Sequence, residues 1–223
     1  MTTFLFAFTA LFTIVNPLPG AFIFLGATQD LGARVRAQLS LWVAIYAFSI
    51  IAASLYVGGY VLLFFGISLP VLKVAGGIVI AVSGWRMLTG PDTSEQRRDE
   101  TASALPVVVT PSRLAFYPLT MPLTTGPGTI SVAISIGANR PTKLGAELMF
   151  FAETALATLL LALLVYVFYR YSERLARVIG PTGTTVVVRL TAFLLFCIGI
   201  QVLWTGLEQL LSGATIGISL PES

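Results

Sequence analysis

Long stretches of the chain contain no charged residue, and this feature limits the possible folds more than any other. No Asp, Glu, Lys or Arg occurs before Asp30, between Arg36 and Lys73, or between Arg113 and Arg140. A helix needs about 20 apolar residues to cross a hydrocarbon core of about 30 Å, and each stretch is long enough. Only 10% of the residues are charged and the mean hydropathy is +0.90, whereas soluble domains contain roughly 25% charged residues. The sequence therefore predicts an integral membrane protein.

The apolar segments are long enough to form six transmembrane helices. They cover Thr3–Leu25, Leu39–Phe65, Pro70–Leu88, Leu114–Ile136, Leu144–Tyr169 and Val186–Leu210. No basic residue precedes the first segment and no small-residue cleavage site follows it, so it is interpreted as a membrane helix and not as a signal peptide. We expect an all-α, polytopic membrane fold.

The distribution of Lys and Arg predicts the orientation. Most basic residues lie in or beside the loops after the first, third and fifth spans, and only Arg140 and Lys143 lie in loops on the opposite side. Loops rich in Lys and Arg stay in the cytoplasm, so both termini are expected outside it. In the loop after the fifth span, Glu173 and Arg177 have the spacing of an ion pair on one helical turn.

The two halves of the chain resemble each other weakly. Pro17-Leu18 corresponds to Pro122-Leu123, and Lys73 corresponds to Arg189. Because each copy has three spans, an odd number, the copies are expected to insert with opposite orientation. The predicted organisation is a repeat at 1–90, a cytoplasmic linker at 91–112, a second repeat at 113–212 and a short tail at 213–223. Inverted repeats are typical of transporters with a substrate site near the midplane of the membrane.

Proline and glycine interrupt the first and fourth spans at matched depths. The first interruption is Asn16-Pro17-Leu18-Pro19-Gly20, and the second extends from Pro118 to Gly128. Proline removes a backbone donor and clashes with the preceding turn, so helices 1 and 4 are expected to be broken in mid-membrane. The N-termini of half-helices suit an anion, and the carbonyl groups across each break could hold a cation. Two kinked helices whose backbone groups are satisfied by neighbours are the alternative.

We place the candidate substrate site at these two interruptions. Glu153 is a candidate for ion or proton coupling, because a carboxylate deep in a membrane is costly unless it is neutral, paired or facing a cavity; a structural hydrogen bond is the alternative. Gln201 could bind the solute or a neighbouring helix. The candidate substrate-binding residues are Asn16, Pro17, Gly20, Pro122, Thr124, Thr125, Gly126, Gly128 and Gln201.

Several runs of the sequence resemble the MarC family of bacterial inner-membrane proteins. They are Asn16-Pro17-Leu18, Phe65-Gly66-Ile67-Ser68-Leu69-Pro70, Ala75-Gly76-Gly77, Trp85-Arg86-Met87-Leu88, Pro118-Leu119-Thr120-Met121-Pro122, Gly126-Pro127-Gly128-Thr129-Ile130, and Arg189-Leu190 through Gly199-Ile200-Gln201. The resemblance covers nearly the whole chain. It implies a six-span protein of the bacterial inner membrane, related to the LysE-type amino-acid exporter superfamily, in which some relatives are described as neutral amino acid transporters. Pro19 departs from the family pattern by adding a second proline to the first motif.

The residue types present argue against several functions. The chain has no His and a single Cys, Cys197, which excludes Ser-His catalysis, an ordinary structural zinc site and an internal disulfide. The three aspartates Asp30, Asp92 and Asp99 fall in expected loops, so no aspartyl pair is expected within the membrane. Basic residues spread over short loops form no nucleic-acid-binding face. We expect no cofactor and no enzymatic activity.

The function that fits these observations is secondary transport or export of a small polar solute by alternating access, with a neutral amino acid as the first candidate. A non-transporting membrane scaffold and an intramembrane enzyme are the alternatives. The expected partners are the lipid bilayer and the solute, and a homo-oligomer is left open.

Overall fold

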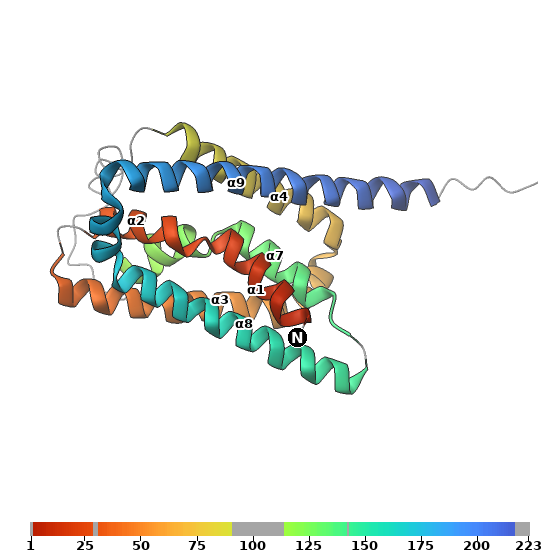
Figure 1. Cartoon of the computed structure of the whole chain (residues 1–223). Coiled ribbons are helices and arrows are strands. Elements are labelled where there is room, and N and C mark those ends of the chain that lie inside the picture. Colours follow the sequence, from red (N-terminus) through yellow and green to blue (C-terminus); the bar gives the residue numbers. More distant parts are fainter. Residues whose placement is uncertain (1, 29–30, 91–113, 142, 217–223) are drawn as a thin grey trace, which may run out of the picture.

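The fold was analysed in a computed structural model that describes residues 2–28, 31–90, 114–141 and 143–216, and these residues form a bundle of helices (Figure 1). The predicted linker at 91–112 and the end of the predicted tail, 217–223, lie outside the described residues, as do Asp30, Asp92 and Asp99. The elements are α1 (Thr2–Val15), α2 (Pro17–Ala27), α3 (Ala33–Phe65), α4 (Leu69–Thr89), the π-helix η1 (Ala115–Thr124), α7 (Pro127–Ala138), α8 (Leu144–Arg170) and α9 (Ser172–Ile216).

Five of the helical segments described are long and apolar enough to cross a membrane: Thr2–Ala27, Ala33–Phe65, Leu69–Thr89, Gly145–Arg170 and Ser172–Ser212. The all-helical membrane architecture is therefore confirmed. The predicted fourth span, Leu114–Ile136, does not form a helix of this length, because the chain leaves helical geometry between η1 and α7, at Thr125 and Gly126. A count of six spans is thus not reached by helix length alone.

The sixth predicted span, Val186–Leu210, is only part of a longer helix. α9 already begins at Ser172 and changes direction at Gly180, whose φ of 75° is a left-handed conformation that glycine adopts without strain. Pro181 follows at once. Much of the loop expected here is therefore helical, and the expected ion pair forms, with 3.2 Å between Arg177 Nη2 and Glu173 Oε1.

The helices are arranged in layers (Figure 1). α4 and α9 pack together along one side of the bundle, α3 and α8 along the other, and α1, α2 and α7 lie between them. The N-terminal end of α1 and the C-terminal end of α9 lie at the same end of the bundle. At the other end, Arg36 of α3 forms an ion pair of 2.9 Å with Glu173 of α9.

Glycines bring the main chains of α4 and α9 into contact. A Cβ atom at Gly77 would lie 2.8 Å from the carbonyl oxygen of Gly199, and one at Gly84 would lie 2.5 Å from the backbone nitrogen of Phe196. Small residues permit this close approach between membrane helices, which associate by packing and not by a hydrophobic force. At these positions the main chains of the two helices are consequently in direct van der Waals contact.

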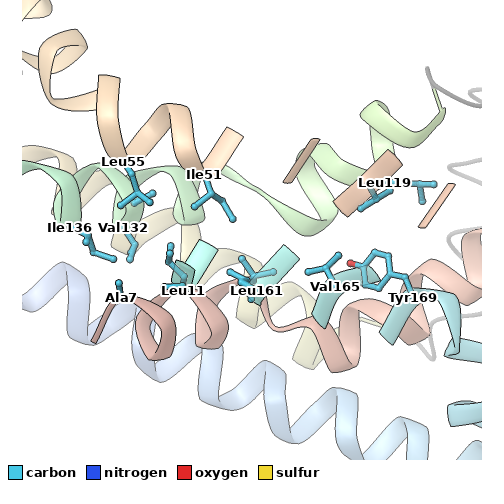
Figure 2. Close-up of a cluster of buried hydrophobic side chains, with 14 of the residues drawn as sticks. Ala7, Leu11, Ile51, Leu55, Leu119, Val132, Ile136, Leu161, Val165 and Tyr169 are labelled. Carbon is cyan, nitrogen blue, oxygen red and sulfur yellow. The ribbon is translucent and has the colours of Figure 1, made fainter. Parts of the chain in front are cut away.

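Buried and exposed apolar side chains are placed as a lipid environment requires. Figure 2 shows a buried cluster that includes Ala7 and Leu11 of α1, Ile51 of α3, Val132 of α7 and Leu161 of α8. Other large apolar side chains face outward, as on many positions of α3, α4 and α9. A contiguous apolar exterior of this kind marks a surface that lipid covers.

Candidate substrate cavity

The first helix interruption is centred on Asn16. α1 ends at Val15 and α2 begins at Pro17, and Asn16 between them has φ 49° and ψ 64°. Asn is among the few residues other than glycine that visit this left-handed region. Its side chain does not cap α2, so the Asn16 amide forms no hydrogen bond within its own turn.

Two prolines change the hydrogen bonding on both sides of Asn16. Pro17 and Pro19 have no N–H group, so the carbonyl groups of Thr13 and Val15 lack the donor that an uninterrupted helix would supply four residues later. The start of α2 is poor in donors for the same reason. Of its early N–H groups, that of Gly20 donates to the Asn16 carbonyl at 3.2 Å.

The second interruption lies between η1 and α7. The η1 segment is a wide turn in which threonine hydroxyls donate to carbonyl oxygens five residues earlier, from Thr120 to Ala115 (2.7 Å) and from Thr124 to Leu119 (2.8 Å). The backbone is then extended at Gly126, with φ −78° and ψ 175°. Threonine hydroxyls thus satisfy carbonyl groups that regular helix geometry leaves open.

The first turn of α7 has backbone donors to spare. Pro127 occupies the first helical position, where a missing N–H costs nothing, and the Gly126 N-cap supplies no side-chain hydrogen bond. The Ile130 N–H donates to the Gly126 carbonyl at 3.2 Å. The N–H groups of Gly128 and Thr129 come before that bond and have no partner within the helix.

Both interruptions line one cavity of about 460 Å³, a volume typical of sites for small molecules. The first contributes Asn16 and Gly20, and the second contributes Thr124, Gly126, Gly128 and Thr129. The cavity extends from there to Ala27, in the last turn of α2, and to Arg86 and Met87, in the last turn of α4. Two segments more than a hundred residues apart in sequence therefore share one polar site.

The structure brings some of the predicted site residues together and separates others. Asn16, Gly20, Thr124, Gly126 and Gly128 line the cavity. Pro17 and Thr125 are buried beside it without lining it, and the hydroxyl of Thr125 donates to the Thr120 carbonyl. Gln201 lies on the exposed face of α9, away from the cavity, and the side chain of Pro122 lies outside the described residues.

Glu153 also lies away from the cavity. Its Oε2 accepts a hydrogen bond of 2.9 Å from the backbone N–H of Phe4, in the first turn of α1. A carboxylate that accepts from a first-turn N–H group satisfies an orphan donor and complements the helix dipole. This contact corresponds to the structural alternative, and the coupling role stays a prediction.

Sequence reasoning missed three polar residues that line the cavity, Ser83, Arg86 and Thr129. It also missed Tyr169, which contacts the lining residue Thr124. Arg86 is the only charged residue among those that line the cavity, and no carboxylate of the described residues lies within ion-pairing distance of it. Arg86 is also one of the basic residues beside the loop after the third span, from which the orientation is predicted. The only signal for it in the sequence is its place in the run Trp85-Arg86-Met87-Leu88, one of the runs that resemble the MarC family.

Tyr169 supports the cavity from behind. Its side chain is completely buried (Figure 2). Its hydroxyl lies 2.8 Å from that of Thr124. The ring stacks on Phe24 of α2 with 4.7 Å between centroids, and a Cβ atom at Gly20 would lie 2.7 Å from the Tyr169 hydroxyl. One side chain of α8 thus contacts α2 and η1 together.

Comparison with known proteins gives one consistent result. The family model described as "MarC family integral membrane protein" matches residues 1–211. Proteins named "UPF0056 inner membrane protein MarC" from Escherichia coli (strain SMS-3-5 / SECEC), Escherichia coli (strain K12) and Shigella flexneri are each 32% identical to the chain over 203 residues, covering 90% of the chain and 92% of the relative. No solved structure matches the chain.

Proposed function

The chain belongs to the MarC family of inner-membrane proteins, and we propose that it is a secondary transporter or exporter of a small polar solute. The observation that carries the proposal is the shared cavity of about 460 Å³ between two helix interruptions. Non-helical backbone at membrane depth is tolerated where it lines a cavity. A scaffold protein would gain nothing from two such interruptions that meet.

The proposed architecture has six spans in two inverted repeats, with α1–α2 and η1–α7 as the broken helices. Contacts across α4 and α9 support this symmetry. Gly77 packs against Leu203, and the corresponding contact in the other half is that of Gly199 with Ala81. Gly84 packs against Phe196, and its counterpart is the contact of Gly206 with Val74. Gly77 and Gly199 are 122 residues apart (199 − 77), as are Gly84 and Gly206 (206 − 84). Lys73 and Arg189 are only 116 apart (189 − 73), so this packing does not follow the correspondence between Lys73 and Arg189 expected from the sequence.

The packing of the other helices follows the same relation. α3 of the first half contacts η1 and α7, and α8 of the second half contacts α1 and α2. α4 contacts α7, and its counterpart α9 contacts α2. A pseudo-twofold axis between the halves would pass beside the cavity, where such transporters place the substrate.

Among the described residues, apolar side chains seal one end of the cavity and not the other, and this asymmetry supports alternating access. Beyond the interruptions, Ala7 and Leu11 of α1 pack against α3 and α7 at Leu55 and Ile136 (Figure 2). The opposite end reaches the last turns of α2 and α4 and the exposed Arg86. With the orientation expected from the basic loops, this state is closed to the outside and open toward the cytoplasm.

A neutral amino acid is the first candidate solute. The cavity offers backbone N–H groups at α7, and carbonyl groups without their usual donors at the end of α1. A zwitterion carries both complementary charges at a separation of a few ångströms. The side-chain amide of Asn16 adds a neutral hydrogen-bonding group.

The test is counterflow in proteoliposomes that contain the purified protein, with small neutral amino acids and imposed Na⁺ or proton gradients. Exchange of a labelled solute is expected for the wild type and is expected to be lost in Gly128→Leu, because a side chain there collides with Ile80 and fills the cavity. Gly145→Leu is the matched control, since nothing lies within 4 Å of a Cβ atom at that position. Absence of exchange for every solute in the wild type, or normal exchange in an inserted Gly128→Leu protein, would overturn the proposal.

A further inference from the structure

We infer that the solute is recognised through a carboxylate, which is held by the first turn of α7 and the hydroxyl of Thr129, and that Arg86 attracts it into the cavity. This inference rests on the proposed function and adds to it a chemical class of substrate and two residues with separate tasks. It depends on three observations: a threonine hydroxyl that is open to the cavity and has no partner among the described residues, uncapped backbone donors, and the sign of the charge at the cavity.

Thr129 carries the first observation. The residue is only 3% exposed and lines the cavity, yet its hydroxyl forms no hydrogen bond with any described residue. The other two hydroxyls of the lining are already engaged, that of Thr124 with the Leu119 carbonyl and that of Ser83 with the Val79 carbonyl. The Thr129 oxygen is not among the buried, unpartnered side-chain atoms of the described residues, so it is open to the cavity. Its hydroxyl is therefore a donor that a ligand in the cavity can bind.

The first turn of α7 provides donors at the same place. The N–H groups of Gly128 and Thr129 have no helical partner, and the Gly126 N-cap has no side chain to supply one. The positive end of the α7 dipole also faces the cavity here. The start of α2 is a weaker anion site, because Pro17 and Pro19 remove two of its N–H groups.

The charge at the cavity has one sign. Arg86 is the only charged residue of the lining, and no Asp or Glu of the described residues lines it. A solute with only a positive charge would meet Arg86 and the α7 dipole without a compensating carboxylate. A carboxylate is the planar acceptor that an arginine guanidinium and helix N–H groups both suit.

The two residues lie at different depths and so act at different steps. Arg86 is exposed in the last turn of α4, whereas Thr129 is buried at the interruption. An exposed charge attracts a ligand at a strength that salt reduces. A buried hydrogen bond to a charged group contributes more, and salt affects it little. For an amino acid, the amino group would then lie toward the open carbonyl groups of Thr13 and Val15, of which Val15 lines the cavity.

Binding of matched probes to the purified full-length protein in detergent tests the inference. The probes are L-alanine, propionate, which keeps the carboxylate alone, and ethylamine, which keeps the amine alone. Thermal unfolding gives the affinity for each probe, because a ligand that binds the native state raises Tm. We expect L-alanine and propionate to raise Tm and ethylamine to have no effect; an equal shift with ethylamine, or no shift with either carboxylate, would overturn the inference.

Substitutions at Thr129 and Arg86 test the separate roles proposed for these two residues. Thr129→Val keeps the shape and removes the donor, and a loss of roughly tenfold in carboxylate affinity is expected, with recovery in Thr129→Ser. The control is Thr205→Val on α9, whose hydroxyl is bonded to the Gln201 carbonyl of its own helix. Unchanged affinity in Thr129→Val would remove Thr129 from the site.

Arg86→Gln is expected to weaken binding a few-fold at low salt and to have a smaller effect at about 0.5 M salt. Arg174→Gln, a change at an arginine that lies over the Tyr171 ring and outside the cavity, is the control. Equal losses in both variants would show that Arg86 has no specific task. Counterflow separates the two proposals: transport of a solute without a carboxylate would overturn only the inference, and carboxylate binding without transport would overturn only the proposed function.

Discussion

The hydroxyl of Tyr169 lies 2.8 Å from the hydroxyl of Thr124, and both side chains are buried. Because the Thr124 hydroxyl donates to the Leu119 carbonyl, Tyr169 is the donor in this contact. The Tyr169 ring also stacks on Phe24, beside Gly20. One residue of α8 therefore fixes the distance between the two interruptions that form the cavity.

Removal of the Tyr169 hydroxyl should loosen this connection. Tyr169→Phe keeps the ring but loses a buried hydrogen bond, and a destabilisation of about 1 kcal/mol is expected, measured as a lower Tm of the purified protein. Tyr171→Phe, at an exposed position two residues later, is the control and should leave Tm unchanged. A Tyr169→Phe protein as stable as the wild type would show that the contact contributes nothing.

Gly20 should not tolerate a side chain while Tyr169 keeps its hydroxyl. The Cβ atom of Gly20→Ala would lie 2.7 Å from that oxygen, and overpacking of this kind costs about 1–3 kcal/mol. Gly26→Ala in the same helix is the control, because no atom lies within 4 Å of its Cβ. In the Gly20→Ala/Tyr169→Phe double variant the loss should be smaller than the sum of the single losses; simple additivity would contradict the proposed collision.

Substitutions at Asn16 should distinguish the effect of its backbone conformation on stability from the effect of its side chain on solute binding. Its left-handed conformation is easy for glycine and costs alanine about 1 kcal/mol. Asn16→Gly is therefore expected to keep Tm and to reduce solute affinity, because the amide that lines the cavity is lost. Asn16→Ala should reduce both. Equal affinity in wild type and Asn16→Gly would exclude the side chain from binding.

Glu153 gives a prediction about coupling. Glu153→Gln keeps an acceptor oxygen for the Phe4 N–H, so this hydrogen bond and the pH dependence of counterflow should both be preserved. Glu153→Leu removes the acceptor and should lower Tm by about 1 kcal/mol. Loss of proton-driven transport in a stable Glu153→Gln protein would instead support the coupling role predicted from its depth.

Local chemistry explains why much of the fold could be predicted from the sequence. The charge-free stretches require membrane helices, and proline next to Asn16 or Gly126 prevents a regular helix whatever the surroundings. The end of α1 at Val15 and the start of α7 at Pro127 both follow from missing N–H groups. Glu173 and Arg177 were paired correctly because that contact depends on helical spacing alone.

The remaining features depend on which face of a helix points inward. Charge counting placed Arg86 near the membrane surface, but depth does not tell whether a side chain faces lipid or a cavity. Gln201 was placed correctly in the middle of a helix, and it faces outward. The positions of Thr129 and Tyr169 at the cavity depend on how α7 and α8 pack in the bundle, and no sequence pattern links residues of different helices.

The backbone contact between α4 and α9 limits how such a protein can move. Side chains can change rotamer when helices slide, but Gly77 and Gly84 pack against the main chain of α9, and at these two points there is no side chain to adjust. α4 and α9, one helix from each half of the chain, are therefore expected to move as one rigid unit. Opening the sealed end of the cavity would then require the interrupted helices, α1–α2 and η1–α7, to tilt relative to α4 and α9. The two halves of the chain would not separate as independent bodies.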